Sequence, residues 1–192
     1  MMQKNRLLII AVVLALAQIG FLAWIIAGRA AILRNGQDVL LKVEPVDPRD
    51  LLRGDYVRLG YEISSIPANL VANADAKAPA PDAIFVRLKK DADGFWHPVS
   101  GSLGKPAGTP LGTDEAEIRG TTDAGWSAQQ NAIIRVDYGI ERFYLPEGEG
   151  KEIERDMRIR SFSILAAIGK DGTAQIKALM DGDKVLFTEP LY

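Results

Sequence analysis

Residues 133–144, which read IIRVDYGIERFY, alternate between apolar and polar side chains more cleanly than any other part of the chain. In an extended strand, successive side chains point to opposite faces, so this alternation predicts a β-strand with one buried face. The apolar face would carry Ile134, Val136, Tyr138, Ile140 and Tyr144, and the polar face Arg135, Asp137 and Glu141. Arg142 interrupts the apolar face near its end.

The chain on both sides of this stretch consists of short strand-like runs separated by turn residues. We expect further strands at residues 39–44, 55–63, 83–89, 95–99, 115–120, 161–168, 174–180 and 184–187. The Asp-Gly pairs at 93–94 and 171–172 predict hairpin turns. Loops are expected near 72–82 and 101–113, and a short helix at 151–158. The fold class is therefore mainly β: a single antiparallel β-rich domain, barrel-like or sandwich-like, with one short helix.

An apolar segment at residues 7–27 precedes this domain. It contains no charge and one strongly polar side chain, Gln18; at about 1.5 Å per residue, such a helix crosses the roughly 30 Å hydrocarbon core. We divide the chain into a short basic tail at 1–6, a transmembrane anchor helix at 7–27, a juxtamembrane linker at 28–37 and a β-rich domain at 38–192. The alternative, a cleaved signal peptide, has a shorter apolar region and a small-x-small cleavage site, which the residues after Ala27 match poorly.

The orientation of the anchor is not decided by charge, because basic residues flank it on both sides. A very short N-terminal tail before a large C-terminal domain favours a domain outside the cytoplasm. Within the anchor, Ala11, Ala15 and Gln18 share one helical face, where small residues allow close approach and an amide gains from a partner. This face either packs against another membrane helix or reflects the ordinary alanine content of such helices.

The composition argues against several classes of site. The 192 residues carry 23 basic and 25 acidic side chains, a net charge of -2, which gives no electrostatic basis for nucleic-acid binding. The chain has no cysteine, and its single histidine, His97, excludes a zinc site built on several histidines. We predict no metal site, no cofactor and no small-molecule ligand, and we expect His97 to be an ordinary hairpin residue.

Catalytic arrangements are equally sparse in the sequence. No G-x-S-x-G pattern surrounds a serine, so a nucleophile elbow is not predicted. Asp137 and Glu141 would lie about 13 Å apart on one face of an extended strand. Glycosidase carboxylates lie roughly 5–9.5 Å apart, so this pair does not match that geometry, although another strand could supply a closer partner. The sequence identifies no catalytic residue and favours a non-enzymatic role.

The stretch at residues 54–61, GDYVRLGY, follows Arg53 and so contains an Arg-Gly-Asp tripeptide. Gly54 gives the backbone freedom to turn, and Asp55 can cap that turn before the chain enters a strand. A cell-adhesion ligand needs the tripeptide at an exposed loop tip, whereas here it runs directly into a strand. The tripeptide is therefore explained as the entrance to a strand.

The same residues carry a family resemblance. The stretch matches G-D-Y-x-x-L-x-Y through Gly54, Asp55, Tyr56, Leu59 and Tyr61, and the chain resembles the GDYXXLXY family of bacterial membrane-anchored proteins. Residues 47–53 and 138–148 are also similar to that family, so with the anchor the resemblance covers nearly the whole chain. It implies a membrane-anchored bacterial protein without an established activity, often found with multi-spanning membrane proteins. We interpret the five motif residues as mainly structural.

We therefore predict a single-pass protein of the bacterial inner (cytoplasmic) membrane, with its C-terminal domain on the periplasmic or extracellular side. Its expected role is that of a non-enzymatic accessory or interaction module for a multi-spanning membrane protein. The alternative is an envelope glycan- or peptide-binding domain or hydrolase, in which aromatic side chains or carboxylates would converge in one pocket. Candidate partner contacts are Arg53, Arg58, Glu62, Asp137, Glu141 and Arg142, and candidate helix–helix contacts are Ala11, Ala15 and Gln18.

Overall fold

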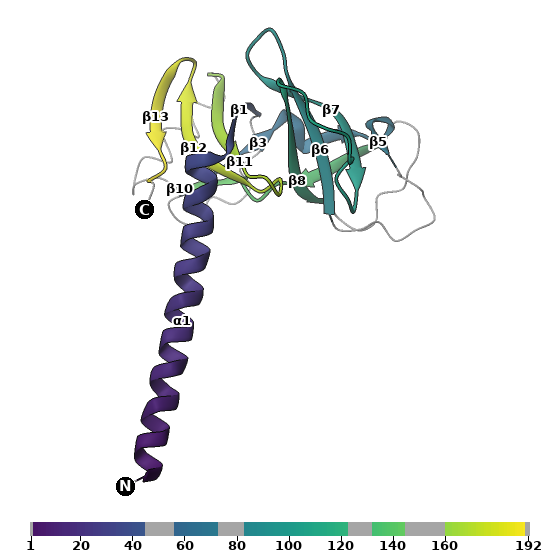
Figure 1. The fold of residues 1–192 in the computed structure, drawn as a ribbon. Helices are drawn as coiled ribbons and strands as arrows, with labels where there is room; N and C mark the ends of the chain where they lie inside the picture. The colour runs from purple at the N-terminus through teal and green to yellow at the C-terminus, as the bar shows by residue number, and fades with distance from the viewer. Residues whose placement is uncertain (1, 45–55, 73–82, 123–131, 145–159, 191–192) are drawn as a thin grey trace.

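A long N-terminal helix, α1 (Met2–Asn35), extends from a β domain, with the N-terminus at its free end (Figure 1). A computed structural model describes residues 2–44, 56–72, 83–122, 132–144 and 160–190. The large apolar side chains from Ile9 to Ile26 are between 40% and 72% exposed in the single chain. Because these side chains point in all directions around the helix, its surroundings must be apolar for the helix to be stable. The expected N-terminal apolar helix is confirmed.

The helix continues past its predicted end at residue 27, so residues 28–35 of the segment predicted as a juxtamembrane linker are helical. The reason is tertiary packing, because Ala30 and Leu33 are buried where α1 meets the domain. The helix stops at Gly36, whose N–H donates to the Ile32 carbonyl at 2.8 Å. A Cβ on Gly36 would lie 2.6 Å from that oxygen and 2.9 Å from the carbonyl oxygen of Ile168. Only glycine fits this close approach.

The first sheet contains five antiparallel strands in the order β13-β12-β11-β1-β3. Its strands are β1 (Gln37–Glu44), β3 (Gly60–Tyr61), β11 (Phe162–Ile168), β12 (Ala174–Asp181) and β13 (Lys184–Thr188). Helix α1 contacts β11 and β12, and β1 begins directly after Gly36. The helix is therefore joined to this sheet by packing as well as by the chain.

The second sheet contains six strands in the order β4-β9-β8-β6-β7-β5. Its strands are β4 (Ser65–Pro67), β5 (Val71–Ala72), β6 (Ala83–Lys90), β7 (Trp96–Leu103), β8 (Glu115–Thr122) and β9 (Ile133–Asp137). All its pairs are antiparallel except β5 with β7. Two short strands, β2 (Tyr56–Arg58) and β10 (Arg142–Tyr144), form a separate antiparallel pair. The predicted mainly β, antiparallel fold class is confirmed.

The chain passes from the first sheet to the second through a short 3-10 turn, η1 (Glu62–Ser64), which connects β3 to β4. A second 3-10 turn, η2 (Ala68–Leu70), follows β4. Both sheets contribute to one hydrophobic core, in which Leu41 and Ile164 from the first sheet and Ile84, Ile118 and Ile134 from the second are completely buried. Each such side chain contributes about 1.5–3 kcal/mol through its removal from water.

The stretch 133–144 does not form the single strand that its alternation predicted. It divides into β9 and β10, which belong to different sheets, with a turn between them at Gly139, whose φ is +78°. Ile134, Val136, Tyr138 and Ile140 are buried as expected. Beyond the turn the pattern shifts by one residue, so that Phe143 is buried and Tyr144 is 66% exposed. Placing Tyr144 on the apolar face was therefore wrong.

Other boundaries also differ from expectation. The strand predicted at 55–63 is divided into β2, β3 and η1, although Val57, Leu59, Tyr61 and Ile63 are all buried, as its alternation predicted. Strand β7 extends to Leu103, so the loop predicted at 101–113 begins after that residue. The predicted helix at 151–158 and residues 73–82 of the other predicted loop lie outside the described residues.

Candidate functional site

The structure brings together the described parts, 56–61 and 138–144, of the two segments that carry the family resemblance. Strand β2 pairs with β10, so that Val57 lies opposite Phe143 and Arg58 opposite Arg142. The next N–H along the chain, that of Leu59, donates to the Glu141 carbonyl at 2.8 Å. The motif segment is therefore held by the segment that follows the turn at Gly139, and both lie at the edge of the core.

Two buried tyrosines fasten these segments to each other. The Tyr61 hydroxyl donates to the Ile140 carbonyl at 2.5 Å, and the Tyr138 hydroxyl donates to the Ile63 carbonyl at 2.6 Å. Burial, and secondarily the nearby Glu141 charge, raises the pKa of Tyr61 and Tyr138 well above its ordinary value. Both phenols therefore remain protonated donors, and Tyr61 at the end of β3 and Ile63 within η1 are both bonded to the β9–β10 turn.

The turn at Gly139 forms an acidic corner from two carboxyl groups, Asp137 and Glu141. The Glu141 carboxyl accepts the Tyr138 N–H at 2.6 Å, and the Asp137 carboxylate accepts the Gly139 N–H at 2.9 Å. Burial, followed by a side-chain hydrogen bond with Asp137, raises the pKa of Glu141 to about 7. The separation of about 13 Å expected for an extended strand was wrong, because the turn folds Glu141 back onto Asp137.

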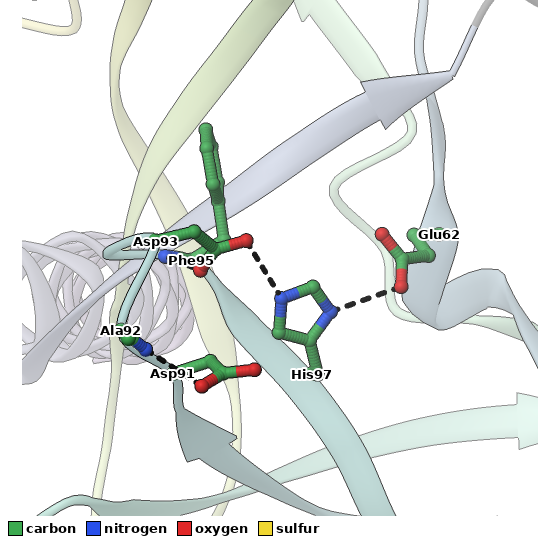
Figure 2. Close-up of polar contacts among 6 residues, drawn as sticks. All are labelled: Glu62, Asp91, Ala92, Asp93, Phe95 and His97. Carbon is green, nitrogen blue, oxygen red and sulfur yellow. Dashed lines mark hydrogen bonds and ion pairs between the residues drawn. The ribbon is translucent and has the colours of Figure 1, made fainter.

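His97 joins two carboxylates from different parts of the chain (Figure 2). Its Nδ1 lies 2.9 Å from Oε1 of Glu62, and its Nε2 lies 3.2 Å from Oδ2 of Asp93. The hydrogen bond to Glu62, and then that to Asp93, raises the pKa of His97 against the opposing effect of desolvation. Asp93 is itself positioned by the Phe95 N–H at 2.9 Å, a bond that lowers the pKa of Asp93.

His97 is the functional candidate that the sequence analysis missed. Asp93 and His97 lie on either side of the Asp-Gly turn joining β6 to β7, and this four-residue spacing was visible in the sequence. The contact with Glu62, 35 residues away, was not visible. An ordinary hairpin histidine was expected, whereas this one connects the hairpin to η1.

The other candidate contacts are distributed over the molecule. Ala11, Ala15 and Gln18 are exposed positions of α1. Arg58 and Arg142 lie opposite each other on exposed positions, whereas Glu62 faces His97. Tyr56 lies in β2, while Arg53, Gly54 and Asp55 lie outside the described residues.

The described residues give little support to a metal site, an aromatic stacking surface or a glycosidase-like pair of carboxylates. Within the described residues no group of three or more His, Asp and Glu side chains is arranged to hold a metal ion. Tyr138 is buried and Tyr144 is exposed, so the two rings do not form one stacking surface. The Asp137 and Glu141 carboxyl groups accept the N–H groups of the adjacent residues Gly139 and Tyr138, so both serve to hold the turn.

A β domain on an N-terminal apolar helix, with a buried tyrosine brace at its motif, defines the class of this protein. The chain matches the family described as GDYXXLXY protein over residues 18–179 and belongs to that family. No curated protein and no solved structure matches it. By length and composition, Ile9–Asn35 can cross a membrane, a property that anchors share with signal sequences. Family and helix together fit a membrane-anchored protein of unknown activity.

Proposed function

We propose that this protein is a single-pass component of the bacterial cytoplasmic membrane. In this proposal the β domain lies on the periplasmic or extracellular side and acts as an accessory module for a polytopic membrane protein. Its work is to bind and position that partner, without a chemical step of its own. The family match and the apolar helix support the membrane location, and the orientation is part of the proposal.

The observation that carries the proposal is the combination of an exposed apolar helix with a firmly packed helix end. Side chains such as Leu16 are 63% exposed, whereas Leu33 is 2% exposed against the domain. A cleaved signal sequence gains nothing from such packing, whereas a permanent anchor uses it to fix the domain relative to the membrane. The packing at Gly36 therefore supports an anchor that stays attached.

The candidate face of α1 points in a direction suited to a partner. Gln18 and Gly36 are separated by about five full turns at 3.6 residues per turn, so they lie on the same side of the helix. Gly36 faces Ala167 and Ile168 of β11. A membrane helix packed on Ala11, Ala15 and Gln18 would therefore lie beneath the β domain. Such a partner could contact the anchor and the domain at once.

The domain offers a polar surface beside the acidic corner. Arg58 and Arg142 are exposed cross-strand neighbours, so this surface presents two basic side chains to a partner. The alternative of an envelope glycan- or peptide-binding domain or hydrolase has less support, because its aromatics and carboxylates do not match the geometry it requires.

The test is to extract the full-length protein from its native membrane in mild detergent and identify co-purifying proteins by mass spectrometry. Two alanines provide a matched pair of variants, Ala15→Leu on the candidate face and Ala17→Leu about 200° away around the helix. Gln18→Leu removes the amide from the same face as Ala15. All three positions are exposed in the single chain, so folding of the domain should be unchanged.

The expected result is one stoichiometric polytopic protein, retained by Ala17→Leu and weakened by Ala15→Leu and Gln18→Leu. Equal retention in all three variants would remove the helix face from the proposal. Recovery of the protein alone from wild-type membranes would contradict the accessory role itself.

A further inference from the structure

The three residues that carry the chain from β3 toward β4, residues 61–63, are held from two sides. On one side, Glu62 contacts His97. On the other side, Tyr61 bonds to the Ile140 carbonyl, and the Ile63 carbonyl accepts the Tyr138 hydroxyl. Because β3 belongs to the five-stranded sheet and β4 to the six-stranded sheet, these contacts fix a connection between the two sheets.

The His97 side of this arrangement needs a proton. Each imidazole nitrogen faces a carboxylate, at 2.9 Å for Glu62 and 3.2 Å for Asp93 (Figure 2). Carboxylates only accept hydrogen bonds, and a neutral imidazole has one N–H, so both bonds form together only with the imidazolium. The raised pKa of His97, caused first by Glu62, agrees with this requirement. Loss of the proton breaks one of the two bonds.

The opposite side needs a proton as well. The Asp137 carboxyl accepts the Gly139 N–H at 2.9 Å and the Glu141 carboxyl accepts the adjacent Tyr138 N–H at 2.6 Å, so one turn brings the two acidic groups together. The Tyr138 hydroxyl in turn holds Ile63. When Glu141 loses its proton, two negative carboxylates remain at this turn and repel each other. That repulsion acts on the backbone that positions Tyr138.

The surrounding charges do not replace these protons. Lys89 lies opposite His97 on β6, and the Lys42 charge acts on Asp93. Around the acidic corner, Arg135 lies two residues before Asp137 on β9, Arg142 follows Glu141, and Arg58 lies opposite Arg142 on β2. The Tyr61 and Tyr138 phenols stay neutral between about pH 5 and 8, because burial raises their pKa well above its ordinary value. The groups whose protonation the hinge uses are Glu141, whose pKa is raised to about 7, and His97, whose pKa is raised by its two carboxylate partners.

We propose that residues 61–63 form a proton-dependent hinge between the two sheets, locked in acid by His97 and by the Asp137–Glu141 pair. At alkaline pH both sides release and the connection between the sheets loosens, so the distance between the sheets varies more, while the shared core and the Arg119 N–H bond to the Gly172 carbonyl still hold them together. The surface presented to a binding partner then depends on the pH around the domain. This inference stands on the described contacts and does not require the proposed accessory role.

The test measures the distance between the sheets in the full-length protein. The chain contains no cysteine, so spin labels can be attached to Val99→Cys on β7 and Val185→Cys on β13, both exposed positions. Double electron–electron resonance then gives the distribution of distances between the two labels in detergent at about pH 5 and about pH 8. Circular dichroism at each pH shows that the domain remains folded. We expect a narrow distribution in acid and a broader or shifted one in alkali.

Substitutions show which side chains carry the protons that lock the hinge. Glu141→Gln carries a permanent N–H for Asp137 and a carbonyl for Tyr138, so it should reduce the change with pH. His97→Gln should broaden the distribution already in acid; if it does not fold, Glu62→Gln tests the same bond. Glu117→Gln, a carboxyl group bonded to the Ala107 N–H outside the hinge, is the control. Identical distributions at both pH values, or an unaltered pH response in Glu141→Gln and in the His97 or Glu62 variant, would overturn the proposal.

Discussion

Helix α1 and the β domain use the same apolar residue types in opposite ways. From Ile9 to Ile26 the large apolar side chains of α1 are exposed, whereas Leu41, Leu59 and Ile164 of the domain are at most 1% exposed. The domain supplies its own apolar surroundings, and the helix requires them from outside. The two regions meet at Ala30, Leu33 and Gly36, so the orientation of one is set by the other.

The largest expected effect comes from comparing a leucine-to-alanine substitution in the domain with the same change in α1. Leu59→Ala removes a buried side chain and should lower the free energy of unfolding of the domain by about 2–5 kcal/mol. Leu16→Ala removes a side chain that does not contact the domain, and it should change the free energy of unfolding by less than about 0.5 kcal/mol. Thermal unfolding of the full-length protein in detergent checks both. Equal losses would contradict the separation of the two regions.

The junction between the regions can be tested with a pair of glycines. In Gly36→Ala the new Cβ would meet two carbonyl oxygens at 2.6 and 2.9 Å, so the backbone must shift, at a cost of about 1–3 kcal/mol. In Gly28→Ala, within the same helix, nothing lies within 4 Å of the new Cβ, and alanine is the better helix former. Protease resistance of residues 28–37 should fall in Gly36→Ala only.

A smaller loss is expected at the tyrosine brace. Tyr61→Phe keeps the ring but leaves the Ile140 carbonyl without its donor, at a cost of about 1–2 kcal/mol, because a carbonyl without a partner is less costly than an orphaned N–H. Tyr138→Phe, which removes the other hydroxyl of the brace from the Ile63 carbonyl, should lower the melting temperature by a similar amount. An unchanged melting temperature in both variants would contradict the brace.

The smallest effect is the dependence of stability on pH. The pKa of Glu141 rises from 4.5 to about 7 on folding, so the folded state favours its proton, and stability falls as pH rises between those values. The raised pKa of His97 gives stability that is present below 6.5 and lost as pH passes through its folded value. The melting temperature should therefore fall from about pH 5 to about pH 8, by a few degrees because solvent screens these partly exposed groups. Glu141→Gln should flatten this slope, and a melting temperature that rises over this range would contradict the assignment.

Local pattern was sufficient for much of the fold. Alternation placed Val57, Leu59, Tyr61 and Ile63 in the core, and the Asp-Gly pairs located both hairpin turns. The break in 133–144 had a signal, because an isolated glycine such as Gly139 within a strand pattern often marks a turn or bulge. The helical segment at 28–35 had a signal too, because Ala30, Leu33 and Arg34 are good helix formers and Gly36 follows as a helix-ending residue.

The candidate site was harder to predict, because it depends on tertiary contacts between residues far apart in the sequence or on opposite sides of a turn. The His97–Glu62 contact joins residues 35 positions apart, and the Asp137–Glu141 contact exists only because the chain reverses at Gly139. Sequence spacing on an assumed straight strand placed these two carboxyl groups too far apart. The residue types were visible in the sequence, but the distances between them are properties of the tertiary fold.

The most direct test of the central claim, a membrane anchor that holds the domain outside the cytoplasm, is labelling of single cysteines in intact cells. Gln3→Cys lies before the apolar segment and Asp183→Cys lies in the exposed turn between β12 and β13. A membrane-impermeant maleimide should label Asp183→Cys and leave Gln3→Cys unlabelled until the membrane is opened, with the full-length protein in the membrane fraction. Labelling of Gln3→Cys alone, or recovery of a soluble protein that lacks α1, would contradict the account.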